Sequence, residues 1–211
     1  MKQLIIAVTV TVIVLCKFTD LCSNSVSAQV SAQLVDSGKD KNGPNAITFS
    51  GKSNAQLLVE ANAGDAFAQH ELGVNYYNNG DPVTARCWFL KAAKQGFARS
   101  QNELGLLYQD GEGVKQDNEK AKYWFEQAAK NGHAGGMNNL AAVYMLEGYS
   151  EKAVPWFQRS ADLGYVEALY NLAMCYKDGK GVKKNLIKAK TLLQTAAEKG
   201  DIMSAIELMN M

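Results

Sequence analysis

Residues 104–132 read LGLLYQDGEGVKQDNEKAKYWFEQAAKNG, and residues 172–200 read LAMCYKDGKGVKKNLIKAKTLLQTAAEKG. Both stretches open on leucine, carry a tyrosine four residues later, continue through a Gly-x-Gly-Val segment and end on glycine. A recurrence of this length indicates either a duplicated binding site or a duplicated structural unit. The rest of the chain decides between these two interpretations.

Regularly spaced glycines show that the unit occurs more than twice. Five glycines each close an alanine-rich or Ala/Ser-containing segment at spacings of 32, 36, 32 and 36 residues: Gly64, Gly96, Gly132, Gly164 and Gly200. The first half of each period reads LGVNYY, LGLLYQ, LAAVYM or LAMCYK, and the second half reads ARCWFLKAA, AKYWFEQAA, AVPWFQRSA or AKTLLQTAA. Three independent sets of residues at one period indicate a tandem repeat.

The longer periods contain Gly-x-Gly-Val at 111–114 and at 179–182, which the shorter periods lack. Insertions confined to one turn leave the stacking of the repeats intact. A phosphate-binding loop would need a preceding strand and the Gly-x-x-x-x-Gly-Lys-Ser/Thr spacing, and neither is found. We therefore assign these glycines to turns.

Each period is predicted to form two helices. In the second half, Ala121, Trp124, Phe125, Ala128 and Ala129 follow the spacing of one helical stripe. Helix-capping side chains are expected before the second helices, and the final glycine suits a helix end that needs left-handed backbone. The expected caps are Asp81 (before Pro82), Asp117 and Asn185.

The pattern Leu-Gly-x-x-Tyr…Gly-x-Gly-Val…Ala-x-x-Trp-Phe-x-x-Ala-Ala-x-x-Gly resembles the Sel1-like repeat (SLR) family, a relative of the tetratricopeptide repeat. The resemblance covers about residues 64–211 and implies an all-α fold in which antiparallel helix pairs stack as a right-handed α-solenoid of about ten helices. The predicted domain runs over 53–211, with a leading helix at 53–63, repeats at 65–96, 97–132, 133–164 and 165–200, and a capping helix at 201–211.

Two repeats depart from the family pattern. Ala141 and Ala173 replace the glycine of the first helix in the third and fourth repeats, and Leu192 replaces the tryptophan of the fourth. Pro155 falls inside the second helix of the third repeat, where it removes a backbone hydrogen bond. We expect that helix to start late or to kink.

The N-terminus is predicted to direct export. An apolar run, LIIAVTVTVIVL at 4–15, follows Lys2, and Val26-Ser27-Ala28 fits a signal-peptidase site before Gln29. Residues 1–28 are therefore interpreted as a signal peptide and residues 29–52 as a flexible linker, which places the protein in the periplasm or outside the cell. An uncleaved membrane anchor is the alternative.

Charge and residue type exclude several function classes. Without residues 1–28 the chain has 20 basic and 20 acidic residues, so electrostatics gives no reason to expect nucleic acid or a stable membrane contact. No spacing typical of a metal site or a catalytic nucleophile is found. His133 is interpreted as a turn residue, and no cofactor, metal or catalytic residue is predicted.

The two cysteines that follow the signal peptide are predicted to be free thiols. Cys87 belongs to a second helix of the first repeat and Cys175 to a first helix of the fourth. Helices pack about 8–10 Å apart, so two intervening repeats separate these residues beyond the about 7 Å limit for a disulfide. Some secreted SLR proteins have a disulfide in each repeat and carry a β-lactamase label, but this sequence lacks that cysteine pattern.

In related tetratricopeptide arrays the first helices line a concave groove that binds partners. Carried over by the Leu-Gly-x-x-Tyr alignment, three columns of side chains are the candidate site. The polar column is His70, Asn102, Asn138 and Tyr170; the apolar column is Val74, Leu106, Ala142 and Met174; the third column is Tyr77, Gln109, Met145 and Lys177. We expect the polar column to be exposed, and leave open whether the apolar column packs against a neighbouring helix.

The repeat-signature residues are assigned to the core instead: Leu72, Gly73, Tyr76, Trp88, Trp124 and Trp156. The sequence thus favours an exported scaffold or adaptor that binds a protein or peptide in its groove without covalent chemistry. The alternatives are a β-lactam-hydrolysing or peptidoglycan-related enzyme and a membrane-anchored organiser.

Overall fold

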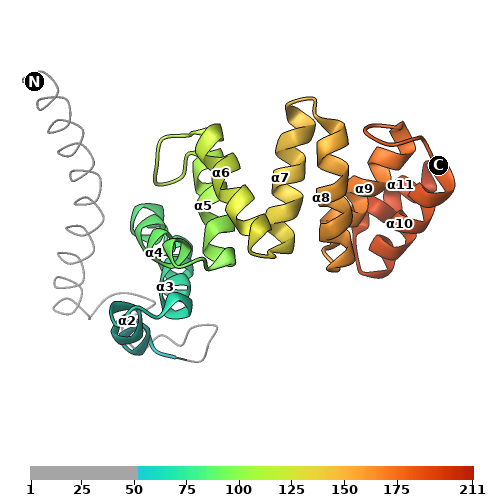
Figure 1. Cartoon of the computed structure of the whole chain (residues 1–211). Coiled ribbons are helices and arrows are strands. Elements are labelled where there is room, and N and C mark those ends of the chain that lie inside the picture. Colours follow the sequence, from blue (N-terminus) through green and yellow to red (C-terminus); the bar gives the residue numbers. More distant parts are fainter. Residues whose placement is uncertain (1–51) are drawn as a thin grey trace, which may run out of the picture. The chain divides into compact units, whose positions relative to one another are not determined.

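The computed structural model describes residues 52–211 (Figure 1). The predicted signal peptide and all but the last residue of the predicted linker lie outside the described residues. Residues 52–211 form ten helices and no strand, which confirms the predicted all-α fold. The helices are α2 (Asn54–Asn62), α3 (Ala66–Asn78), α4 (Pro82–Lys94), α5 (Ala98–Asp110), α6 (Asn118–Lys130), α7 (Ala134–Leu146), α8 (Ser150–Asp162), α9 (Val166–Asp178), α10 (Leu186–Glu198) and α11 (Ile202–Met209).

The chain forms two compact units, one ending at Ala92 and the other running from Ala93 to Met211. In the first unit, Leu57 and Ala61 of α2 pack against Leu72 of α3 and Trp88 of α4. This cluster explains why the short α2 is ordered, since it covers the apolar face of the first repeat.

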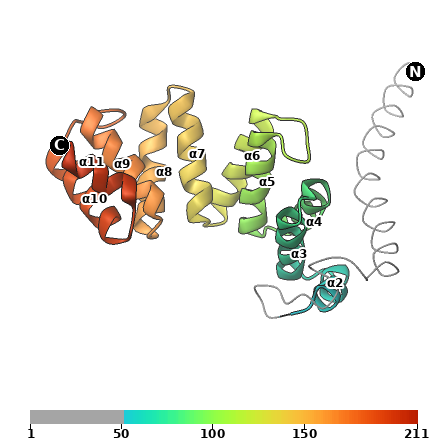
Figure 2. The same cartoon turned by 180° about the vertical axis from the view of Figure 1, so that it is seen from behind.

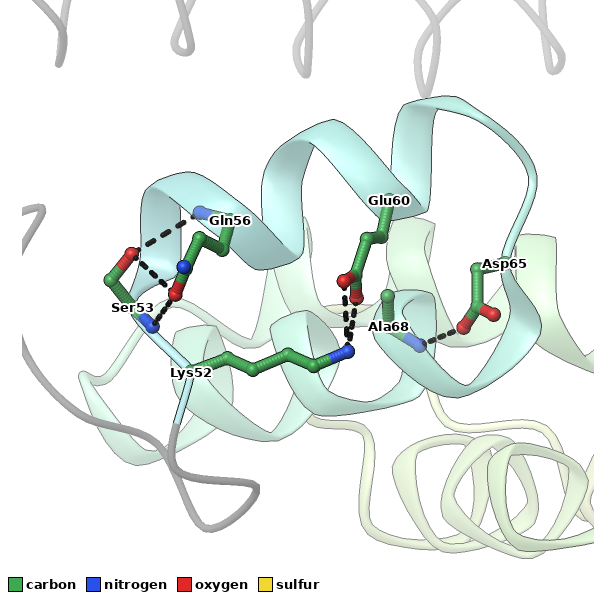
Figure 3. Close-up of polar contacts among 6 residues, drawn as sticks. All are labelled: Lys52, Ser53, Gln56, Glu60, Asp65 and Ala68. Atoms are coloured by element: carbon green, nitrogen blue, oxygen red, sulfur yellow. Dashed lines mark hydrogen bonds and ion pairs between the residues drawn. The ribbon is translucent and has the colours of Figure 1, made fainter.

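Polar contacts cap the N-terminal end of α2 (Figure 3). The Ser53 hydroxyl accepts a hydrogen bond from the backbone N–H of Gln56, and the Gln56 side chain accepts one from the backbone N–H of Ser53. Lys52 forms an ion pair of 2.7 Å with Glu60 two turns along the helix. These reciprocal contacts satisfy donors that a helix N-terminus leaves without a partner.

In the second unit, every helix packs against the next one along the chain, from α5 to α11. Figures 1 and 2 show the pairs α5/α6 and α7/α8 lying side by side and antiparallel from both directions. Phe125 of α6 and Phe157 of α8 each centre a buried cluster that the following first helix completes. The repeats of this unit therefore share one continuous core.

Side-chain caps fix where most helices begin. The predicted caps Asp81, Asp117 and Asn185 each accept a hydrogen bond of 3.0 Å from a backbone N–H of the first helical turn. A second set, one residue after the repeat-ending glycines, caps α3, α7 and α11: Asp65, His133 and Asp201. His133 is thus a helix cap at the turn where it was predicted to lie.

The Gly-x-Gly-Val segments are turns, as predicted. Gly111 and Gly179 end α5 and α9 in left-handed backbone, with φ of 75° and 74°. Gly181 also has a positive φ, and a Cβ there would lie 2.3 Å from the carbonyl oxygen of Ser150. Glycine is needed at 181 because this turn touches the start of α8.

The glycine of the first helix permits a close approach of its own second helix. A Cβ on Gly73 would lie 2.5 Å from the Phe89 ring, and one on Gly105 would lie 2.3 Å from the Phe125 ring. Both rings are almost fully buried. In both repeats the close contact of the two helices therefore depends on a glycine without a side chain on the first helix and an aromatic ring on the second.

Pro155 does not delay its helix, so the expected late start is wrong. The second helices α4, α6, α8 and α10 all begin 14 residues before the repeat-ending glycine, and each has 13 residues. Pro155 is exposed, while Ala153, Val154, Phe157 and Ala161 bury the opposite side of α8. That apolar burial outweighs the single backbone hydrogen bond that the proline removes.

The core assignment of the tryptophans holds for one of the three. Trp88 is fully buried, but Trp124 and Trp156 are half-buried. The phenylalanine that follows each tryptophan is the buried member of the pair, and Arg159 lies 4.8 Å from the Trp156 ring. Leu72 and Gly73 are buried, and Tyr76 is half-buried.

The cysteine prediction is correct for Cys175, a buried free thiol. It is wrong for Cys87, which is disulfide-bonded. The spacing of the repeats excluded only one pairing, that of Cys87 with Cys175. That pairing is indeed not formed.

Candidate partner-binding face

The predicted polar column is buried rather than exposed. His70, Asn102 and Asn138 are only 6%, 6% and 8% exposed, and Tyr170 is half-buried. The prediction assumed that amides in a core would lack partners. The structure supplies those partners from the neighbouring repeat.

Successive first helices of the second unit are joined by amide side chains. Asn139 of α7 donates a hydrogen bond of 3.0 Å from Nδ2 to Asn102 Oδ1 of α5. Asn171 of α9 donates one of 2.9 Å from Nδ2 to Asn138 Oδ1 of α7. We call these four residues the amide ladder; it fixes α5, α7 and α9 beside one another.

The ladder has an inner and an outer row. Asn102 and Asn138 are the buried acceptors, whereas Asn139 and Asn171 are half-buried and retain accessible surface. Sequence reasoning chose the inner row and missed the outer one, which follows it by a single residue. The available signal was a polar residue at this next position in all four repeats: Glu71, Glu103, Asn139 and Asn171.

The apolar column lies partly in the core, which answers the question that the sequence left open. Val74, Leu106, Ala142 and Met174 are all half-buried. Leu106 packs against the cluster around Phe125, and Ala142 packs against the cluster around Phe157. Leu106, Ala142 and Met174 lie on α5, α7 and α9, the helices that carry the amide ladder.

The third column is divided among different roles. Tyr77 is 43% exposed and Gln109 is exposed. Met145 packs against the cluster around Phe157. Lys177 forms an ion pair with Glu207 of α11, which raises the pKa of the lysine, chiefly through the hydrogen bond. Lys177 therefore ties α9 to the last helix.

Glu103, which the sequence argument did not single out, belongs to this face. Burial raises the pKa of its carboxyl, and a hydrogen bond from Asn102 opposes that rise. This hydrogen bond is long, with 3.5 Å between Asn102 Nδ2 and Glu103 Oε1. Among residues 52–211, Glu103 has no lysine, arginine or histidine within ion-pair distance.

Two aromatic side chains lie near the N-terminal end of α7. His133 Nδ1 accepts a hydrogen bond of 3.0 Å from the backbone N–H of Gly136, which requires that nitrogen to be unprotonated. Burial, and then the charge of Arg99, lower the pKa of His133. A Cβ on Gly135 would lie 3.1 Å from His133 Cε1 and 3.6 Å from the Tyr165 ring, so the tight contact that glycine avoids is with the imidazole.

Neither a metal centre nor a membrane span is found in the described part of the chain. Residues 52–211 contain no group of three or more His, Cys, Asp or Glu side chains that is arranged to hold a metal ion. No helix among these residues combines the length and apolar character needed to cross a bilayer.

Uniform helix pairs that follow one another along the chain and are joined by tight glycine turns define an α-helical repeat protein. The Sel1 repeat model matches residues 66–97, 98–133, 134–165 and 166–201, and the chain belongs to this family. Proteins built from this fold generally act as scaffolds for protein–protein interaction.

Two solved structures illustrate the likeness. A protective antigen present in uropathogenic Escherichia coli strains, which displays an SLR fold, matches with a TM-score of 0.69 and 32% identity over 74% of this chain and 35% of that one. A Sel1 repeat protein from Oxalobacter formigenes matches with a TM-score of 0.67 and 27% identity over 74% of this chain and 65% of that one. This chain therefore spans less than two thirds of either protein. No curated protein sequence matches it.

Proposed function

We propose that this protein is an exported helical-repeat scaffold that binds a protein or peptide on the face lined by α5, α7 and α9, without covalent chemistry. The observation that carries the proposal is the outer row of the amide ladder. Asn139 and Asn171 are held in place by their bonds to the inner row and still present accessible polar surface beside half-buried apolar side chains.

This arrangement suits an extended polypeptide. An asparagine side chain has two N–H donors and two acceptor lone pairs. Each outer amide donates only one hydrogen bond to the ladder, and Asn139 Oδ1 also accepts one of 3.4 Å from Asn138 Nδ2. The remaining sites match the alternating N–H and C=O groups of a peptide backbone. Leu106 and Met174, on the same helices, offer apolar surface to its side chains.

Site-specific photo-crosslinking tests the location of the binding face. A photoreactive phenylalanine analogue is placed at Tyr170, which is half-buried and adjacent to Asn171, and in a matched variant at Ile187, which is 82% exposed on the second helix α10. We expect partner crosslinks at 170 and none at 187. Equal crosslinking at both positions, or crosslinking at 187 alone, contradicts the proposal.

Export is supported by the charge and hydropathy pattern of residues 1–28. The test is N-terminal sequencing of the mature protein from the periplasmic and secreted fractions of a Gram-negative host. We expect the mature chain to begin at Gln29. A chain that keeps its first 28 residues and requires detergent for extraction would instead identify a membrane-anchored organiser.

A further inference from the structure

The charges on the face of the amide ladder are not balanced around Glu103. Helix α7, which lies next to α5 across the ladder, reads AGGMNNLAAVYML and contains no charged residue. On α9, Lys177 is already paired with Glu207. Arg99, one turn before Glu103 on α5, is exposed and lies close enough to His133 to lower its pKa.

A half-buried carboxylate in these surroundings retains most of its capacity for hydrogen bonds. An ionised carboxylate accepts at about four lone-pair sites, and Glu103 receives only the long contact from Asn102. Removing a carboxylate from water without a paired charge is unfavourable. A cationic group from another molecule would therefore be attracted by the charge of the Glu103 carboxylate and could donate hydrogen bonds to its vacant acceptor sites.

The neighbouring groups narrow down the source of that cation. Asn139 donates to the amide of Asn102, the residue beside Glu103, so the outer row of the ladder begins next to the carboxylate. The Oδ1 atom of Asn171 accepts no hydrogen bond from any residue between 52 and 211. A peptide backbone that crosses Asn139 and Asn171 can thus place one of its side chains at Glu103.

We propose that the face lined by α5, α7 and α9 selects a polypeptide segment with a lysine or arginine, whose cationic side chain pairs with the Glu103 carboxylate while the outer amides bind its backbone. This proposal rests on the proposed function and specifies the partner's chemistry. In this proposal Glu103 determines which peptides bind, whereas Asn139 and Asn171 provide affinity for any extended chain.

The test is selection from a phage-displayed library of random dodecapeptides against the full mature chain. Wild type is compared with Glu103→Gln, which keeps the size and removes the charge, and with Glu198→Gln, the same change at an exposed site on the second helix α10. We expect wild type and Glu198→Gln to enrich peptides with lysine or arginine at one fixed position. Glu103→Gln should enrich peptides without that preference.

Binding measurements with the selected peptide complete the test. Replacing its basic residue by norleucine should weaken binding to wild type about tenfold, as expected for one accessible charged hydrogen bond. The same replacement should leave binding to Glu103→Gln unchanged. Circular dichroism checks that the variant folds, and we expect its stability to equal or exceed that of wild type because it removes an unpaired charge.

These outcomes distinguish failure of the proposed role of Glu103 from failure of the proposed peptide-binding function. Enrichment of peptides without a basic residue by wild type overturns the role of Glu103 and leaves peptide binding standing. A basic preference that persists in Glu103→Gln also overturns it. Failure of wild type to enrich any peptide overturns both proposals.

Discussion

Substituting Gly105 with alanine tests the close contact between α5 and α6. The added Cβ would lie 2.3 Å from Phe125 Cε1 and 2.5 Å from Cδ1, whereas ordinary contacts are 3.4–4 Å. The Phe125 ring is fully buried and cannot turn towards solvent. Either the ring must leave its rotamer or the two helices must separate by about 1 Å.

The magnitude follows from two opposing effects. Overpacking a buried site costs about 1–3 kcal/mol, and the upper part of that range applies because the overlap is severe. Alanine is more favourable than glycine inside a helix by about 1 kcal/mol. We therefore expect Gly105→Ala to lower the free energy of unfolding by about 1–2 kcal/mol, and the melting temperature by roughly 3–6 °C.

The assay is thermal and urea unfolding followed by circular dichroism. The fourth repeat provides a matched design, because it pairs Ala173 on its first helix with Leu193 on its second. Introducing Phe125→Leu should relieve the overlap, so Gly105→Ala should cost less in that background by about 0.5–2 kcal/mol. A melting temperature that rises on Gly105→Ala alone, or strictly additive effects of the two substitutions, would refute the reasoning.

Three further predictions concern single positions. Pro155→Ala restores the N–H that bonds to the carbonyl of residue 151, so unfolding experiments should show about 2 kcal/mol of added stability; a lower melting temperature contradicts this. The pKa of His133 is lowered in the folded state. The stability that the neutral His133 cap provides is therefore complete above the ordinary histidine pKa of about 6.5 and is lost as pH falls towards the lower folded value. Melting temperatures between pH 7.5 and 5 should therefore fall more steeply for wild type than for His133→Asn, which caps without titrating, and equal slopes would exclude this role. Gly181→Ala should destabilise by more than the about 1–2 kcal/mol that left-handed backbone costs alanine, because its Cβ meets the Ser150 carbonyl. Gly164→Ala, with φ of 85° and nothing within 4 Å, is its control, and equal losses for both would show that the clash is relieved.

Local rules were enough to predict the repeats from the sequence. Asp81, Asp117 and Asn185 cap helices because a short acceptor side chain can reach the backbone N–H of its own first turn. Gly111 and Gly179 end helices because left-handed backbone disfavours a Cβ. Both signals depend only on residues close in sequence, and the period made them unambiguous.

The exposure of individual positions could not be predicted in the same way. Asn138 and Asn139 are adjacent polar residues that point about 100° apart on one helix. The sequence pattern alone could not show which of the two is the more exposed. The answer depends on the distance between α5 and α7, which is set by contacts between different repeats. The same reason explains Trp124, which the pattern assigned to the core although Phe125 occupies it.

The amide ladder has a direction, and only the third repeat carries both of its halves. Asn138 accepts from the repeat after it and Asn139 donates to the repeat before it, whereas the second repeat supplies only the acceptor Asn102 and the fourth only the donor Asn171. An internal gene duplication of the third repeat would add a rung and lengthen the array without breaking the ladder. A duplicated second repeat would set a Glu103 carboxylate, which has no N–H, against Asn102. The third repeat, with its two adjacent asparagines, is therefore the repeat whose duplication would extend the array with the ladder intact.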